Sequence, residues 1–459
     1  MTPKRAHGSF IYQSLAKDAE DEIMNYRKKA ITKIQSIVIA AIIIVAAVVG
    51  GTAYYLTLPK TPSSTNEIII GRILPLTGGL AYEAWMAREA YDVAVDRINA
   101  EGGIHSMNNA TLRFVDGDSR LDTDTAIAEF EKLRNTYNPA IFMDGWASSM
   151  TIAIGTQCDR YKIPVWCAVS MSPTLTQQGW KYFFRMPPLA DDYVKGIFDT
   201  IAYINQQYPQ NKTLKIASVY EATLSGESLR DSVRNMSSTY GLSIVLEQGY
   251  DVGTKDFSSL VVQLKAAAPD ATLICGGNAE DSALMARQFH EAGFYSKMIA
   301  GFSGIGIGTA DFINKIGGKE AAKPYYVMQS AGYNPNYQSA EHTWVKNKYF
   351  EMHPGSTEIP ENWVCFYSPM FVLRDALELS GQLHPDNPLD PESIRDAFTR
   401  LNITDPNHPA CIINQYRSDA KGDNALRSVV ITQIIDGEIH GIFPLYKKDT
   451  DMIYPYPTG

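Results

Sequence analysis

The sequence predicts an α/β protein whose main body forms two doubly wound, Rossmann-like lobes. First, short β-branched and apolar runs alternate with amphipathic stretches of helical length, which is typical of βαβ units. Second, this alternation occurs in two successive series, each roughly 120 to 150 residues long. Third, small or polar residues follow nearly every predicted strand, at the sheet edge where doubly wound domains bind ligands.

The first βα unit spans residues 68–104. Its β-branched run at 68–74 predicts a buried parallel strand, which a proline ends because proline lacks a backbone donor. Paired glycines after Thr77 predict a sharp turn, and apolar residues then recur at helical spacing until a second glycine pair. We expect the loop from Thr77 to Tyr82 to form the lip of a ligand crevice. An ordinary βα unit without a ligand is the alternative.

Further strands and helices complete the first series. We expect strands at 110–115, 140–143 and 164–169, and helices at 123–135 and from about 148 to 161. The aspartates after the first of these strands lack the glycine and closing glutamate of a calcium loop. A solvated loop ending in a helix N-cap is therefore expected at Asp116, Asp118 and Asp122.

Hydroxyl groups gather at two of these strand ends. Ser148 and Ser149 lie where a loop meets a helix N-terminus, and Ser170 follows the next strand. Hydroxyls beside free backbone N–H groups can hold an anion or a carboxylate. Simple N-capping is the alternative, and it needs only one of the two adjacent serines.

The second series begins after an extended crossing segment at 182–188. Its predicted strands lie at 214–220, 243–247, 271–275 and 297–300. Its first predicted helix is 191–207, and its second follows the loop 221–226 and ends at 240. A third helix begins after residue 257, and a fourth follows the strand 271–275 and ends at 291. The last third is less regular, with a strand at 324–329, helices at 340–352, 369–380 and up to 401, and a hairpin formed by 428–435 and 439–444.

An N-terminal transmembrane helix is predicted at residues 34–58, because no charged residue occurs from 34 to 59 and roughly 20 apolar residues span a bilayer. The basic residues precede this stretch, so the positive-inside bias places residues 1–33 in the cytoplasm and the folded body outside the cell. Residues 59–66 form a polar linker. The expected location is therefore the cell membrane, with one signal anchor.

Two kinds of processing remain open for this leader. The residues before the apolar run resemble the class III, prepilin-type signal of archaeal surface proteins, which would be cut near Ala30 and would keep the helix. Ala53 ends a weak site for ordinary signal peptidase, but the apolar stretch is longer than a cleaved signal needs.

Charge and motifs exclude several classes of function. Residues 1–35 carry seven basic and four acidic side chains, which give this segment a net charge of +3. The whole chain has a net charge of −9, so the remaining residues together carry −12. An acidic body argues against nucleic acid as a partner. The five cysteines show no zinc spacing, and free buried thiols are expected. No phosphate-binding glycine loop, nucleophile elbow or zinc-protease motif occurs, so we expect no cofactor, no metal and no enzymatic activity.

An ordered set of motifs resembles the type I periplasmic binding proteins, within them the branched-chain amino acid and amide branch, over roughly residues 67–445. The motifs are Leu74-Pro-Leu-Thr-Gly through Ala90, 94–104, 145–149, 164–173 with Leu175-Thr, Phe184-Arg-Met-Pro, Gly226, Asp256-Phe, Pro269-Asp-Ala, Gly276-Gly and Glu291-Ala-Gly293. The resemblance implies two lobes joined by three crossovers, with a ligand in the cleft between them. It implies a first lobe of residues 66–186 and 330–412 and a second of 187–329 and 413–459.

The resemblance also implies a set of binding residues. Ser148 matches the hydroxyl that grips a ligand carboxylate, and Val169 matches a backbone contact. Ser303 replaces the acidic residue that pairs with a ligand ammonium, a bond worth roughly 1.5–3 kcal/mol. A neutral amide-like solute or an organic acid is therefore expected before a free aliphatic amino acid. The expected ligand-binding residues are Thr77, Tyr82, Trp146, Ser148, Ser149, Val169, Ser170, Met171 (where threonine is usual), Tyr220, Ser225 and Asn278 (where aromatic residues are usual) and Ser303, with Trp85 as a further stacking candidate.

The expected function is capture of a small polar ligand, of amino-acid, amide or organic-acid type, for delivery to the permease of an ABC importer. A ligand-sensing receptor ectodomain and a surface-structural protein are the alternatives. The expected partners are the small-molecule ligand, the importer permease and the membrane.

Overall fold

The computed structural model describes residues 66–276, 279–302, 310–319, 321, 326–330, 332–336, 338–356, 358–445 and 448–454. The predicted cytoplasmic segment, the predicted transmembrane helix at 34–58 and the linker up to residue 65 lie outside these residues. Among the helices that are described, none combines the length and the apolar character that crossing a bilayer needs. Contacts divide the chain into residues 1–65 and 66–459, and every buried core cluster of the described residues belongs to the second unit.

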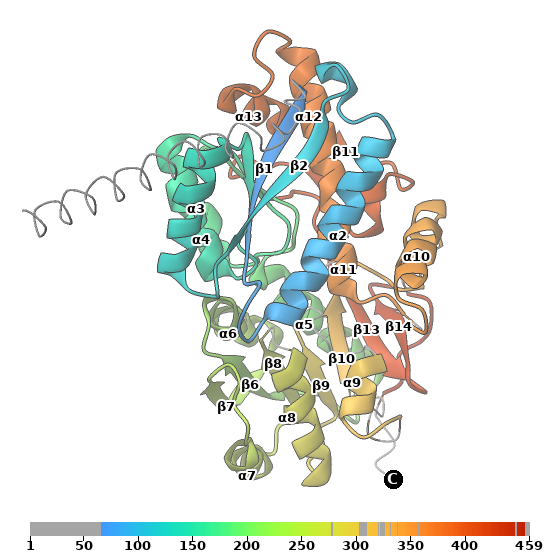
Figure 1. The fold of residues 1–459 in the computed structure, drawn as a ribbon. Coiled ribbons are helices and arrows are strands. Elements are labelled where there is room, and N and C mark those ends of the chain that lie inside the picture. The colour runs from blue at the N-terminus through green and yellow to red at the C-terminus, as the bar shows by residue number, and fades with distance from the viewer. Residues whose placement is uncertain are drawn as a thin grey trace, which may run out of the picture. The chain divides into compact units, whose positions relative to one another are not determined.

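The first sheet has five parallel strands in the order β2-β1-β3-β4-β5. They are β1 (Glu67–Leu74), β2 (Thr111–Asp118), β3 (Ile141–Met143), β4 (Val165–Cys167) and β5 (Phe183–Arg185). The three helices between them are α2 (Ala81–Ala100), α3 (Thr123–Tyr137) and α4 (Ser148–Tyr161). One core cluster joins Ile70 to α2, and another joins Phe142 to Phe130 of α3, so helices cover both faces of this sheet (Figure 1).

Two predictions for this sheet need correction. β2 continues to Asp118 rather than ending at 115, because β1 continues alongside it and pairs Leu74 with Asp118. The crossing segment at 182–188 contains the edge strand β5, whose residues pair with β4 in parallel register.

The second sheet has seven strands in the order β14-β13-β10-β9-β8-β6-β7. They are β6 (Lys215–Glu221), β7 (Ser243–Tyr250), β8 (Ala271–Cys275), β9 (Met298–Gly301), β10 (Tyr326–Ser330), β13 (Val430–Ile435) and β14 (Glu438–Phe443). Its helices are α5 (Ala190–Gln207), α6 (Leu224–Ser237), α7 (Ser258–Ala267), α8 (Ala279–Glu291) and α9 (Ala310–Lys315). The predicted hairpin is confirmed: β13 and β14 pair antiparallel around Asp436 (φ 53°) and Gly437 (φ 80°), as a type I′ turn requires.

The last third adds helices around the first sheet. They are α10 (Ala340–Met352), α11 (Glu361–Tyr367), α12 (Pro369–Leu383) and α13 (Pro391–Arg400), with a small antiparallel pair of β11 (Asn402–Ile403) and β12 (Tyr416–Arg417). The sequence did not predict α11. It packs against α2, where the rings of Phe366 and Tyr91 meet edge to face with centroids 5.2 Å apart, and Figure 1 shows both helices beside α12. This packing places the first turn of α11 beside the ends of the first-sheet strands.

Candidate ligand-binding site

A cavity of about 440 Å³ lies where loops from the two sheets meet. The first sheet contributes residues 146–149 after β3 and 168–171 after β4, whereas the second contributes 221–225 after β6 and Val252 after β7. Residues from α5 and α11 complete the wall. The volume is in the range that holds a small organic molecule, and the cavity lies at the carboxyl ends of parallel strands, where doubly wound folds bind ligands.

The N-termini of α4 and α6 meet in the wall of this cavity. Ser148 is the first residue of α4, and its hydroxyl accepts hydrogen bonds from the Ser172 backbone N–H (3.3 Å) and the Ser225 hydroxyl (3.1 Å). The N-cap of α4 is Ala147, which forms no side-chain cap, so neither serine serves as the N-cap. Both helix ends therefore present backbone donors and hydroxyls to one space, which suits a ligand group that accepts hydrogen bonds.

Close backbone packing fixes the loop before α6. Thr223 is the N-cap, and its side chain accepts from the Gly226 N–H at 3.2 Å. A Cβ on Gly226 would lie 2.2 Å from the Glu221 carbonyl oxygen, so only glycine permits this approach of α6 to the end of β6.

A buried carboxylate holds the loop after β4. Asp144 accepts hydrogen bonds from the backbone N–H groups of Ala168 (3.2 Å) and Ser170 (3.2 Å) and from the Ser170 hydroxyl (3.0 Å). Burial raises the pKa of the Asp144 carboxyl above its usual value, although the hydrogen bonds from Ala168 and Ser170 act in the opposite direction. The Ser170 hydroxyl also lies 2.6 Å from the Thr151 hydroxyl. Ser170 lines the cavity, but its hydroxyl is used to shape the loop.

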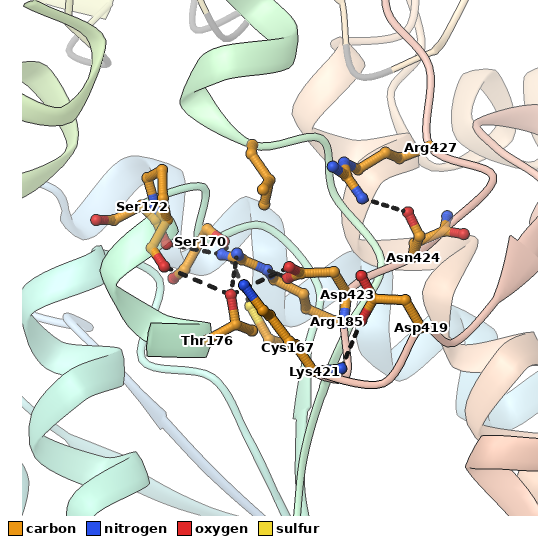
Figure 2. A network of polar contacts seen from close by, with 12 residues as sticks. Cys167, Ser170, Ser172, Thr176, Arg185, Asp419, Lys421, Asp423, Asn424 and Arg427 are labelled. Carbon is orange, nitrogen blue, oxygen red and sulfur yellow. Dashed lines mark hydrogen bonds and ion pairs between the residues drawn. The ribbon is translucent and has the colours of Figure 1, made fainter. Parts of the chain in front are cut away.

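A second buried charge ties the same loop to a distant segment of the chain. Figure 2 shows Arg185 at the end of β5, between residues 170–176 and residues 419–427. Its guanidinium donates to the Ser172 carbonyl oxygen (2.8 Å) and the Thr176 hydroxyl (3.0 Å), and forms an ion pair with Asp423 (2.5 Å). The Arg185 side chain is 0% exposed and that of Asp423 is 6% exposed, so this pair is desolvated.

One aromatic pair forms part of the wall. The Trp146 ring stacks on the Phe366 ring, with centroids 4.8 Å apart and an interplanar angle of 21°. Trp146 has a φ of 70°, in the left-handed region that a bulky residue rarely adopts. Strained backbone of this kind gathers at ligand sites, where the surrounding structure holds it in place.

Most of the predicted site residues line the cavity: Trp146, Ser148, Ser149, Val169, Ser170, Met171 and Ser225. Asn278 and Ser303 lie outside the described residues.

Three predicted residues have other surroundings. The Thr77 hydroxyl donates to Asp118 at 2.6 Å, and Tyr82 is 77% exposed. The Tyr220 ring lies under the guanidinium of Arg230 at 4.7 Å. None of the three belongs to the lining, and Leu80 is the residue of the predicted lip that does. Trp85, the further stacking candidate, lies under Arg88 at 4.7 Å.

The sequence missed a second set of lining residues. From α11 come Glu361, Asn362, Cys365 and Phe366, and from α5 and β6 come Tyr193 and Glu221. Glu221 ends β6, so the rule that selected the serines at strand ends applies to it as well. No comparable signal marked α11, because tertiary packing against α2 brings it to the cavity.

The aspartates within and after β2 have structural partners. Asp122 caps α3 by accepting from the Thr125 N–H at 2.8 Å, which confirms the predicted N-cap. Asp116 pairs with Arg72 at 2.7 Å. Over the part of the chain that the structure covers, no group of three His, Cys, Asp or Glu side chains could hold a metal ion. All five cysteines are free, and four of them are buried.

The chain is similar to proteins of one family. The model of a family described as periplasmic binding protein matches residues 67–438. A Leu/Ile/Val-binding protein homolog 7 from Brucella abortus is 29% identical over 243 residues, which are 52% of this chain and 60% of the relative. A Leu/Ile/Val-binding protein homolog 8 from the same species is 28% identical over 242 residues, which are 52% of this chain and 58% of the relative. The chain thus spans somewhat over half the length of these relatives.

Solved structures share the fold at low identity. A branched-chain amino acid transporter substrate binding protein from Streptococcus pneumoniae, solved in complex with isoleucine, matches with a TM-score of 0.67 and 19% identity, covering 82% of this chain and 100% of the other. A leucine binding protein from Thermotoga maritima matches with a TM-score of 0.67 and 19% identity, and the match covers 82% of this chain and 98% of the other.

Proposed function

Since this chain belongs to the periplasmic binding protein family, whose model matches residues 67–438, we propose that it is an extracytoplasmic solute-binding protein. The family consists of ligand-binding receptors and is generally non-enzymatic. The observation that carries the proposal is the cavity of about 440 Å³, because its wall is shared by loops from both sheets. A ligand there contacts both halves of the molecule at once.

Capture works by closure of two lobes. The first lobe comprises residues 66–186 and 330–412, and the second comprises 187–329 and 413–459. A ligand that contacts both lobes in the closed form and only one in the open form shifts the population toward closure. The hydrogen bond between Ser148 and Ser225 joins the two sides at the cavity and supports this arrangement.

The closed protein delivers its ligand to the permease of an ABC importer. The names of similar proteins support this role, because one is a transporter substrate binding protein and others are Leu/Ile/Val-binding protein homologues. The apolar stretch at 34–58 anchors the chain in the membrane and keeps the binding body outside the cell.

A thermal-shift screen of residues 66–459 tests the proposal. Ligand binding stabilises the folded state by RT ln(1 + [L]/Kd), about 2.7 kcal/mol at a hundred times Kd. We expect at least one member of a panel of amino acids, amides, amines, sugars and organic acids to raise the melting temperature. The absence of a shift across the whole panel would contradict the proposal.

Two variants of α4 locate the site. Ser148→Ala removes a hydroxyl from the cavity wall, and Thr156→Ala removes a hydroxyl from the same helix outside the lining. The ligand-induced shift should fall in the first variant and persist in the second. An equal shift in both would place the ligand elsewhere.

A further inference from the structure

The first turn of α2 carries a buried carboxylate that the proposed capture of a ligand does not use. Glu83 is 5% exposed, although glutamate is a residue type that proteins seldom bury. Its carboxylate accepts a hydrogen bond from its own backbone N–H group. The positive end of the α2 dipole also favours the ionised form at this position. The charge state of Glu83 therefore depends on how well water reaches the carboxylate.

Glu83 lies where the two lobes meet. Leu80, the residue before α2, lines the cavity whose wall the loops of both sheets share. Figure 1 shows the N-terminal end of α2 next to α8 of the second sheet. In the first turn of α8, Glu280 pairs with Lys315 of α9, and both of these charges act on Glu83. A carboxylate on a first-lobe helix is thus faced by two helices of the second lobe.

The charges around Glu83 have opposing effects. Burial raises the pKa of the Glu83 carboxyl above its usual value, and the negative charge of Glu280 adds to this rise. The backbone hydrogen bond and the positive charge of Lys315 act in the opposite direction. Of the other charged groups on adjoining helices, Asp281 accepts from a backbone N–H group at 2.7 Å and Glu361 lines the cavity. Removal from water is therefore the main influence on Glu83.

The lobes touch each other in this structure, so Glu83 is seen in its covered state. Besides the hydroxyl pair already described, the Ser172 hydroxyl after β4 lies 2.8 Å from the Ser228 hydroxyl of α6. Opening of the lobes would separate α8 and α9 from α2 and let water reach Glu83. A carboxyl that returns to water loses its raised pKa. The closed form therefore binds a proton at Glu83 more tightly than the open form does.

We propose that Glu83 couples closure of the two lobes to the uptake of one proton, so that acid favours the closed form. This coupling rests on the proposed function, because it presupposes two lobes that open and close, and it adds a means of regulation to that function. With one proton involved, the ratio of closed to open molecules rises by at most about tenfold for each unit by which the pH falls. Acid therefore favours capture of a ligand, and neutral pH favours its release.

Small-angle X-ray scattering of residues 66–459, without added ligand, tests the coupling. This part of the chain is one compact unit and holds every core cluster of the described residues. We expect the radius of gyration of the parent protein to decrease between about pH 7.5 and about pH 5, which lies just above the usual pKa of glutamate. Glu83→Gln has the shape and the neutrality of the protonated residue. It should be as compact at pH 7.5 as the parent protein is at pH 5, and should change no further.

A carboxylate on the same helix provides the control. Asp96 lies on the exposed face of α2, so Asp96→Asn should follow the parent protein at every pH. Urea unfolding gives a second measurement. A carboxyl whose pKa is raised by folding contributes stability at low pH that is lost as the pH rises. Glu83→Gln should therefore be more stable than the parent protein at pH 7.5 and should approach it in stability at pH 5.

Failure of the coupling and failure of the proposed function are distinguishable. A radius of gyration that stays constant with pH in the parent protein, or that changes equally in Glu83→Gln, overturns the coupling. Such a result leaves the solute-binding function standing, because the thermal-shift panel tests that function at a single pH. Conversely, a compaction in acid that Glu83→Gln abolishes supports the coupling even if no member of the panel binds.

Discussion

The buried ion pair between Arg185 and Asp423 permits a quantitative test of how the cavity is held together. Replacing Arg185 by methionine keeps the length of the side chain and removes its charge. The Asp423 carboxylate then stays buried with the Thr176 hydroxyl, 3.1 Å away, as its remaining side-chain donor. Breaking such a pair from one side costs about 3–5 kcal/mol, because an uncompensated charge remains in the interior.

Urea unfolding of residues 66–459, followed by circular dichroism and by tryptophan fluorescence, measures this loss. Coincident transitions from the two probes justify a two-state free energy. We expect Arg185→Met to lose about 3–5 kcal/mol of unfolding free energy and the double variant Arg185→Met/Asp423→Leu to regain most of it.

A surface pair provides the control. Arg113 and Glu67 pair at 3.0 Å with side chains 42% and 34% exposed, so Arg113→Met should lose no more than about 1 kcal/mol. A loss below about 1 kcal/mol in Arg185→Met, or a double variant as unstable as the single one, would refute the reasoning.

Three further predictions concern the glycine, the cap and a carboxylate outside the cavity. In Gly226→Ala the new Cβ would meet the Glu221 carbonyl oxygen at 2.2 Å, so this variant should lose about 1–3 kcal/mol of unfolding free energy and bind ligand more weakly in a titration. Gly79→Ala is the control: Gly79 has open space around it, so its unfolding free energy should change by less than about 0.5 kcal/mol. Thr223→Ala removes the N-cap of α6 and should lose about 1 kcal/mol in urea unfolding; an unchanged midpoint would contradict this role. Burial alone would raise the pKa of Asp375, but the hydrogen bond from His408 and the charge of Arg374 outweigh it and lower that pKa. A carboxyl whose pKa is lowered by folding stabilises the folded state at pH values above its unfolded pKa of 3.8. This stabilisation is lost as the pH falls through the folded pKa. Asp375→Asn should therefore be less stable than the parent protein at pH 7 and closer to it in stability at pH 3.

The sequence predicted the serine part of the site because parallel strands bring their carboxyl ends to one edge. Ser148, Ser149 and Ser170 each follow a predicted strand, and all three line the cavity. The same rule did not bring Tyr220 into the cavity wall, because adjacent residues of a strand point to opposite faces. Tyr220 therefore meets Arg230, and the next residue, Glu221, lines the cavity.

The part of the site on α11 was beyond the reach of local patterns. A seven-residue helix gives too few turns for periodicity to stand out, and residues 353–368 carried no predicted element. Glu361 reaches the cavity only because α11 packs on α2, more than 200 positions earlier in the chain, through contacts such as that of Phe366 with Tyr91. Thr77 is absent from the lining for a similar reason, since its hydroxyl donates to Asp118 of the neighbouring strand.

Calorimetric titration of a variant with a filled cavity tests the central claim most directly. Ser149→Trp places an indole in the cavity wall, whereas Val262→Trp places one on α7 at a position 68% exposed. With the strongest hit of the thermal-shift screen, we expect one binding site in the parent protein and in Val262→Trp, and no measurable heat of binding in Ser149→Trp. Equal binding in the two tryptophan variants would contradict the claim that this cavity captures the ligand.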